Sequence, residues 1–162
     1  MSQHRLFFAT SVTYQRQPHF RDSRMANLFL ETLFHYRKQG GYRLHDFVLM
    51  PDHFHIILTP SEKLSLEQSV QRIKGGFSFH AGKATHARSE IWQRSFTHHL
   101  ILNTEDLEHH REYVLQNPVR ARLVSKPEDY PYSSVQPRFR MDIVDTFEGP
   151  RIDSQRPKNV KL

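Results

Sequence analysis

The stretch "LMPDHFHIIL" at residues 49–58 decides the fold, because it holds the turn between two predicted strands. The segments 42–49 and 53–59 are rich in aromatic and aliphatic residues, as strands are. Between them, Pro51 and Asp52 predict a tight turn. Two strands joined by so short a connection must be antiparallel neighbours in one sheet.

The second of these strands has two chemically different faces. Side chains alternate along a strand, so Phe54 and Ile56 share one face while His53 and His55 share the other. The apolar face is suited to packing under helices. We therefore expect the two histidines on the opposite face, roughly 7 Å apart at their backbones by the rise over two residues, with side chains that can converge.

Working outward, period-2 patterns predict further strands and period-3.6 patterns predict helices. The expected elements are a strand at 5–14, a helix from Asp22 or Ser23 to Gly40, a helix opened by a capping box of Ser65 and Gln68, a strand at 91–102, and a helix capped by Thr104 and ended by Pro118. The first six elements have the order βαββαβ. This order predicts an α+β protein with a ferredoxin-like antiparallel sheet and two helices on one face. The last helix can lie against the open face.

The chain has 162 residues, which suggests a single domain. We expect this domain at 1–126, followed by a proline-rich and charged C-terminal extension at 127–162 that is partly packed coil and then mobile. The sequence contains neither an apolar run long enough for a membrane span nor a secretory signal, so no membrane partner is expected. It has no cysteine, which excludes disulfides and thiolate metal sites and favours a reducing cytoplasm.

The charge balance favours a polyanionic partner. With 23 Lys and Arg against 17 Asp and Glu, the net charge is +6, and the pI is about 9.8. Candidate phosphate contacts lie in or after the second helix and after the last one: Arg72, Lys74, Lys83, Arg88, Arg120, Arg122 and Lys126. Trp92 and other aromatic residues are candidates for stacking on unpaired bases. For any one of these charged residues, a solvated surface is the simpler interpretation.

His53 and His55 supply half of a metal site, because two imidazoles fixed on a sheet can bind one ion. Alone, the pair is a weak signal, since two such histidines can equally be satisfied by backbone carbonyls. A reactive partner strengthens it, and Tyr113 on the last predicted helix is the candidate. Helical spacing places Asn117 one turn beyond this tyrosine. The adjacent pairs His98 with His99 and His109 with His110 diverge on their own strand or helix, so we interpret these four as structural or DNA-contacting rather than as metal ligands.

The ordered set of segments "MPDHFHIIL", "IWQRSFTHH", "YVLQNPVRARLV" and "DYPYSS" resembles the HUH single-tyrosine transposases, and among them the REP-associated tyrosine transposases. The resemblance spans most of residues 5–134. It implies Tyr113 as the nucleophile and His53 and His55 as ligands of a divalent metal. It also implies a polar ligand one turn after the tyrosine, where Asn117 stands. Gln116 is the alternative if the helix distorts at Pro118, and Asn117 can instead cap the helix end.

The chemistry expected of this set is strand cleavage by a phenol. A tyrosine hydroxyl is a reluctant nucleophile at neutral pH because its pKa is about 10. A divalent metal would neutralise charge on a phosphodiester and hold it in line for attack. Two imidazoles and an amide favour Mn²⁺ over Mg²⁺ as the bound ion. The resemblance to the family implies that Mg²⁺ can also serve. The resemblance further implies a 5′-phosphotyrosine link to single-stranded DNA, a released 3′-OH, and a hairpin with a short flank as the substrate.

Two other functions stay open from the sequence. One is a non-catalytic nucleic-acid-binding module on the same fold. The other is a metal-dependent hydrolase that uses activated water, with Tyr113 only positioning the substrate. The resemblance allows both a monomer and a homodimer, and the C-terminal segment, which lacks a strong apolar stripe, favours the monomer.

Overall fold

A computed structural model describes residues 4–85 and 90–144 of the chain. Its sheet has four antiparallel strands in the order β2-β3-β1-β4. Their bounds are β1 at Phe7–Val12, β2 at Tyr42–Met50, β3 at His53–Pro60 and β4 at Thr97–Leu100. The strand that carries the two histidines is therefore an inner strand, bonded to β1 on one side and β2 on the other.

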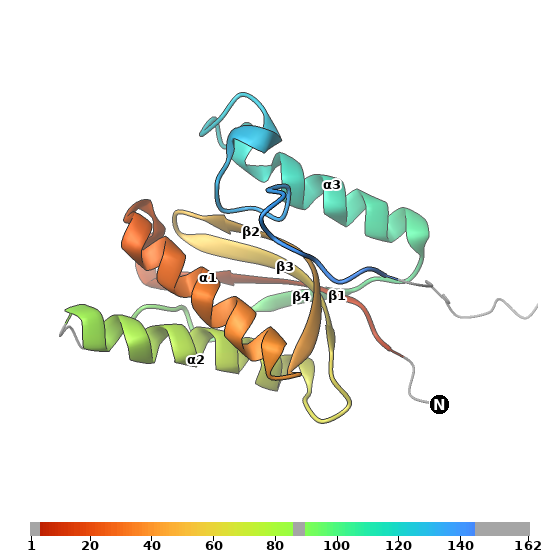
Figure 1. Cartoon of the computed structure of the whole chain (residues 1–162), viewed down its shortest axis with the longest axis horizontal. Helices are drawn as coiled ribbons and strands as arrows, with labels where there is room; N and C mark the ends of the chain where they lie inside the picture. The colour runs from red at the N-terminus through yellow and green to blue at the C-terminus, as the bar shows by residue number, and fades with distance from the viewer. Residues whose placement is uncertain (1–3, 86–89, 145–162) are drawn as a thin grey trace, which may run out of the picture.

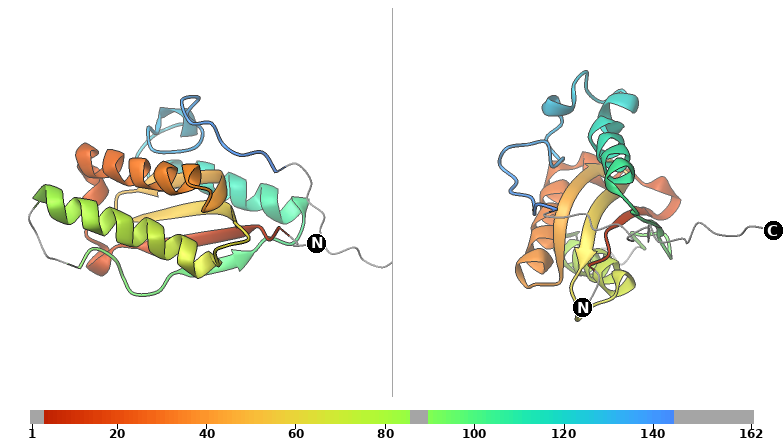
Figure 2. Two further views of the ribbon diagram at one scale, coloured as in Figure 1. Left: turned by 60° about the horizontal axis from the view of Figure 1, so that its bottom comes forward. Right: turned by 90° about the vertical axis from the view of Figure 1, so that its right-hand side faces the viewer.

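In the described ranges, three helices cover both faces of the sheet. They are α1 at Ser23–Lys38, α2 at Leu66–Thr85 and α3 at Thr104–Arg120, and short 3₁₀ turns lie at Tyr14–Arg16, His19–Arg21 and Pro127–Asp129. Helices α1 and α2 lie side by side on one face, and α3 lies on the opposite face (Figures 1 and 2). The predicted α+β, ferredoxin-like βαββαβ arrangement with an additional helix is confirmed.

Local signals in the sequence explain where two helices begin. The Asp22 side chain accepts a hydrogen bond from Arg24 N at 2.9 Å and caps α1. At α2, Ser65 and Gln68 form the predicted capping box, with bonds of 2.9 and 3.1 Å in the two directions. Each bond satisfies a backbone donor that the first helical turn leaves without a partner.

The two faces of β3 contribute to two separate cores. Phe54 and Ile56 pack with α1 and α2 in the larger core, which also contains Phe29 and Phe77. On the other face, Ile57 packs with Leu107 and Val114 of α3 and with Tyr130. The histidines therefore lie on the side of the sheet that α3 covers, as the alternation predicts.

Three predicted details are wrong. Strand β4 covers only Thr97–Leu100 of the predicted 91–102. Gln93 N still donates to Val12 O at 3.0 Å, but Ser95 has a φ of 62°, a left-handed conformation that interrupts the strand. Lys74 of α2 holds this connection by donating to Gln93 O at 2.9 Å and Ser95 O at 3.0 Å. Helix α3 is capped by Asn103, whose side chain accepts from Asp106 N at 2.8 Å, rather than by Thr104. It also continues past Pro118 to Arg120, because a proline in the last turn removes only one backbone donor.

The described part of the C-terminal segment runs alongside β2. Leu49 N donates to Tyr132 O at 2.8 Å, and Ser134 N donates to Phe47 O at 2.9 Å. The Tyr130 hydroxyl donates to Leu49 O. A boundary at residue 126 stays a prediction, and the part of the extension expected to be mobile lies outside the described residues from 145 onward.

None of the helices in the described ranges has both the length and the apolar character that crossing a membrane requires.

Candidate active site

The two histidines of β3 lie next to each other on the face of the sheet that α3 covers. Their ring centroids are 4.8 Å apart, with the ring planes at 76°. His55 is 5% exposed, whereas His53 is only half-buried. Because both side chains project from one inner strand, the sheet fixes their spacing.

Each imidazole is oriented by a hydrogen bond at Nδ1. His55 Nδ1 bonds Thr10 Oγ1 on β1 at 2.6 Å, and His53 Nδ1 bonds Asp52 Oδ1 in the turn at 2.6 Å. Arg16 in turn donates to the other oxygen of Asp52 at 3.2 Å. This use of Nδ1 is typical of metal-binding histidines, whose second nitrogen then faces the ion.

Burial keeps His55 in the neutral form that a metal ligand requires. Desolvation, followed by the nearby charges of His53 and Arg120, lowers the pKa of His55 to about 3. Among the described residues, no hydrogen-bond partner meets its buried Nε2. An unpaired buried nitrogen is costly, so this atom is suited to bind a ligand.

Tyr113 of α3 lies directly beside the His55 imidazole. Its ring centroid is 5.3 Å from that of His55 and 6.0 Å from that of Phe8. The side chain is 41% exposed, so a substrate can reach it. The Arg120 guanidinium lies 4.3 Å from the Tyr113 ring centroid, which places a cation beside the phenol. It also donates to the backbone carbonyl oxygen of Tyr113 at 2.6 Å.

A partly buried ion pair fixes α3 over the sheet. Arg111 Nε donates to Asp46 Oδ2 of β2 at 2.7 Å, and Ser134 donates to Asp46 Oδ1 at 3.2 Å. The helix that carries Tyr113 is thus bonded to the same sheet that carries the histidines.

The structure separates the two candidates for the third ligand. Asn117 is 8% exposed and lies one turn beyond Tyr113. Gln116 instead lines a shallow depression together with Glu105 and Glu112 of α3. The depression does not include Tyr113 or Asn117. Of the two amides, Asn117 is therefore the one on the buried side, and its role as a ligand stays a prediction.

The predicted phosphate contacts divide between the two faces of the sheet. Arg120 and Arg122 follow Tyr113 on the α3 side, whereas Arg72, Lys74 and Lys83 belong to α2 on the opposite side (Figure 2). Lys74 holds the loop before β4 through its two carbonyl contacts, and Lys83 lies 4.4 Å from the Phe79 ring. Arg88 is outside the described residues.

Trp92 belongs to the core and is too buried to stack on a base. It is 7% exposed, packs against Phe54 and Phe77, and donates from Nε1 to Lys74 O at 3.1 Å. The stacking role expected of it is wrong for this conformation, because the loop before β4 turns its indole toward α2.

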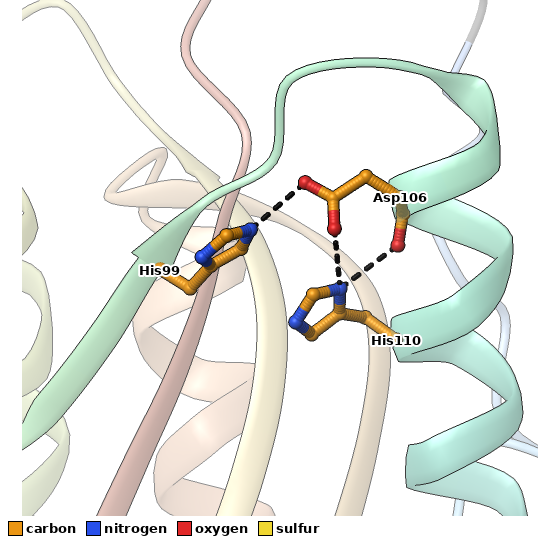
Figure 3. A group of neighbouring side chains, drawn as sticks. All are labelled: His99, Asp106 and His110. Atoms are coloured by element: carbon orange, nitrogen blue, oxygen red, sulfur yellow. Dashed lines mark hydrogen bonds and ion pairs between the residues drawn. The ribbon is translucent and has the colours of Figure 1, made fainter.

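Sequence reasoning missed the residues that orient the site. Sequence reasoning treated Asp52 only as a turn residue. Its position directly before His53 is a signal that could have predicted its bond to that imidazole. Thr10 gave no signal, because its contact with His55 crosses 45 positions of sequence. Sequence reasoning also missed that His99 of β4 and His110 of α3 lie close together, with Asp106 between them (Figure 3).

Comparison with known proteins agrees with this fold and arrangement. The profile of the family described as IS200-like transposases matches residues 5–117. The chain belongs to this family of transposases.

Within that family, the similar proteins are REP-associated tyrosine transposases, which confirms the resemblance seen in the sequence. The chain is 30% identical over 105 residues to a Haemophilus influenzae protein assigned to this group and 30% identical over 99 residues to the REP-associated tyrosine transposase of Escherichia coli K12. The matches cover 59% and 60% of this chain and 60% and 57% of the two relatives. The chain therefore matches less than two thirds of the length of either.

Two solved structures share the fold. A REP-associated tyrosine transposase bound to a REP hairpin has a TM-score of 0.71 at 24% identity and covers 95% of this chain and 100% of its own. A Deinococcus radiodurans protein assigned as a transposase has a TM-score of 0.54 at 18% identity, covering 70% and 91%.

Proposed function

We propose that the protein is a metal-dependent single-stranded DNA endonuclease and strand transferase with Tyr113 as its nucleophile. The observation that carries the proposal is the buried Nε2 of His55, which has no hydrogen-bond partner in the described part of the chain, beside a solvent-exposed phenol, with 5.3 Å between the two ring centroids. A nitrogen acceptor and a nucleophile so placed suit phosphoryl transfer assisted by a metal.

His53 and His55, with Asn117 as the expected third ligand, would hold a divalent ion, Mn²⁺ or Mg²⁺. When bound, this ion supplies positive charge to the scissile phosphate and holds it in place. The residues fit such an ion, because both imidazoles have Nδ1 occupied and the buried Nε2 of His55 lacks a partner among the described residues. Asp52 and Thr10 would keep both rings in the binding orientation.

Tyr113 would attack the phosphorus of a single-stranded segment. Its phenolic oxygen forms a bond to phosphorus, the bond to the 3′ oxygen of the preceding nucleotide breaks, and a 3′-OH is released. The product is a 5′-phosphotyrosine. Because the phosphodiester energy is kept in this link, attack by another 3′-OH reverses the step and joins a strand without ATP.

We propose a DNA hairpin with a short single-stranded flank as the substrate. The hairpin in the solved structure belongs to the relative, and the net charge of +6 on this chain favours a nucleic-acid partner. Arg120 and Arg122 follow the nucleophile and are the expected contacts to the cleaved strand. For Arg72, Lys74 and Lys83 on α2, contact with more distant phosphates stays a prediction.

We also propose that the protein is a monomer and that it acts in the cytoplasm. In the single chain, Tyr113 already lies beside His55, so a partner's tyrosine is not needed to complete the site. Light scattering during gel filtration tests the first statement, and a dimer at working concentration would contradict it.

Incubation with a hairpin oligonucleotide tests the function. The label belongs at the 3′ end, because a 5′-phosphotyrosine retains the fragment downstream of the cut. We expect a labelled protein band that survives denaturation and requires Mn²⁺ or Mg²⁺. Binding without cleavage would instead indicate a non-catalytic binding module, and cleavage without a covalent band would indicate hydrolysis by activated water.

A further inference from the structure

A second cluster of metal-type ligands lies at the junction of β4 and α3. It consists of His99 from the strand and Asp106 and His110 from the first turns of the helix (Figure 3). His99 Nε2 lies 2.8 Å from Asp106 Oδ2, and His110 Nδ1 lies 3.1 Å from Asp106 Oδ1. The carboxylate thus lies between two imidazoles that come from different elements.

The two rings are held in a fixed relation to each other. They stack with centroids 4.7 Å apart and planes at 17°, and His110 also packs on Phe8 of β1 at 4.9 Å. Phe8 is the Cα partner of His99 in the sheet. The pairing of β1 with β4 therefore fixes where His99 lies relative to Phe8, the residue on which His110 packs.

This cluster is separate from the candidate active site. The same Phe8 ring stacks on His55 at 5.3 Å, so one phenylalanine stands between the His53–His55 pair and the second cluster. The donor atoms of the two groups are therefore not shared. A ligand bound at one group leaves the donors of the other free.

The donor set matches what a transition metal prefers. One ligand atom from each of the three residues lies within 4.8 Å of the other two. Around a four-coordinate ion with bonds of about 2.0–2.2 Å, neighbouring ligand atoms lie roughly 3–3.5 Å apart. A pair at the 4.8 Å limit would therefore approach by roughly 1.3–1.8 Å, a change that two side chains can share. Imidazole nitrogens with one carboxylate suit Zn²⁺ and its neighbours rather than Mg²⁺.

The hydrogen bonds that such an ion would replace are few. An ion would replace the contacts of Asp106 with His99 Nε2 and His110 Nδ1 and the bond of 2.8 Å between His110 Nδ1 and Asp106 O. The bond of 3.0 Å that Asp106 Oδ2 accepts from Leu102 N can remain. Losing the imidazole bond leaves Asp106 O available to the regular helical bond. The side chain of His99 is 47% exposed, which leaves room for water to complete the coordination shell.

We propose that His99, Asp106 and His110 form a second divalent metal site, selective for Zn²⁺-type ions, that fastens the edge strand β4 to the start of the helix carrying Tyr113. The site does not depend on the proposed function, because its three ligands play no part in strand cleavage. An ion there would cross-link two elements that the hydrogen bond between His99 Nε2 and Asp106 Oδ2 already joins at 2.8 Å.

The test uses untagged full-length protein in which His53→Ala and His55→Ala remove the first pair. Titration with Co²⁺, followed by visible absorption and calorimetry, is expected to show saturable binding of one ion. Adding His99→Gln and His110→Gln is expected to abolish it. Adding His98→Gln and His109→Gln instead is the matched control, because these neighbours lie on the same strand and helix outside the cluster, and binding is expected to remain.

Absence of saturable binding in the parent variant would overturn the proposal, and so would binding that survives His99→Gln with His110→Gln. Circular dichroism checks that the variants fold. A second measurement needs no further substitution: in the parent variant, Zn²⁺ is expected to shift the imidazole ¹⁵N resonances of His99 and His110 and to leave those of His98 and His109 in place. Shifts confined to other histidines would also refute it.

Discussion

Hydrogen bonds from neighbouring residues set the chemistry of the two candidate ligands. Thr10 and Asp52 each occupy one Nδ1, which leaves the Nε2 atoms of His55 and His53 for an ion. The effect of Thr10 and Asp52 is on the orientation of the rings, and this is a contribution that substitution can isolate.

Replacing Thr10 with valine is expected to weaken metal use without unfolding the protein. Valine keeps the shape but cannot bond His55 Nδ1, so the Mn²⁺ concentration needed for half-maximal cleavage should rise by about 10–100-fold. Thr10→Ser keeps the hydroxyl and is the control. Identical metal dependence in the valine and serine variants would show that the hydrogen bond has no orienting role.

At this scale, the sequence predicts side chains that belong to a motif and misses those that support them. His53, His55 and Tyr113 stand in recognisable segments, and the structure brings His55 and Tyr113 together. The cluster of His99 and His110 was missed because each adjacent histidine pair was considered within its own element. Only the packing of α3 on β4 shows that one member of each pair meets the other.

Helices α1 and α2 pack closely because α2 has a glycine at the contact. A Cβ at Gly76 would lie 2.7 Å from Tyr36 Cε2 and 2.8 Å from its hydroxyl, whereas a Cβ at Gly75 would meet nothing within 4 Å among the described atoms. Two neighbouring glycines thus differ only in what faces them.

Gly75→Ala is expected to raise the free energy of unfolding by about 0.5–1 kcal/mol, because alanine favours the helix and has room. Gly76→Ala should gain less than this or destabilise the protein, because the Tyr36 ring must move. Urea denaturation of both variants measures the difference. Equal stabilisation by the two substitutions would mean that α1 and α2 are not in close contact at Gly76.

Element boundaries were predictable where local chemistry decides them. The capping box at Ser65 and Gln68 formed as expected. The predicted bounds of β4 and the predicted end of α3 were wrong. The left-handed φ of Ser95 interrupts the strand before β4, the last turn of α3 tolerates Pro118, and the hydrophobic periodicity reports neither. The order of elements survived these errors, and it was enough to predict the fold.

For the whole molecule, stability should depend on pH through a histidine outside the site. Burial lowers the pKa of His45 below its usual 6.5, while the Asp142 carbonyl, bonded to His45 Nδ1 at 2.8 Å, opposes the shift. Below about pH 6.5, the unfolded chain takes up a proton that the folded chain resists. Stability from this group is therefore present above that pH and is lost as pH falls.

The variant His45→Gln keeps an amide donor for Asp142 O and cannot titrate. We expect its free energy of unfolding to fall less steeply between pH 7 and 5, by at most about 1.4 kcal/mol per pH unit compared with the parent. His55, which shares this behaviour, remains in both proteins. Parallel pH profiles from urea denaturation would contradict the assignment of a buried neutral His45.

The most direct test of the central claim compares Tyr113→Phe with the parent on a 3′-labelled hairpin oligonucleotide in Mn²⁺. Tyr14→Phe is the control, because Tyr14 is also 41% exposed. The account predicts that the parent and Tyr14→Phe form a covalent band that resists denaturation. It predicts that Tyr113→Phe binds the hairpin with unchanged affinity and forms no such band. A covalent band formed by Tyr113→Phe would contradict the account.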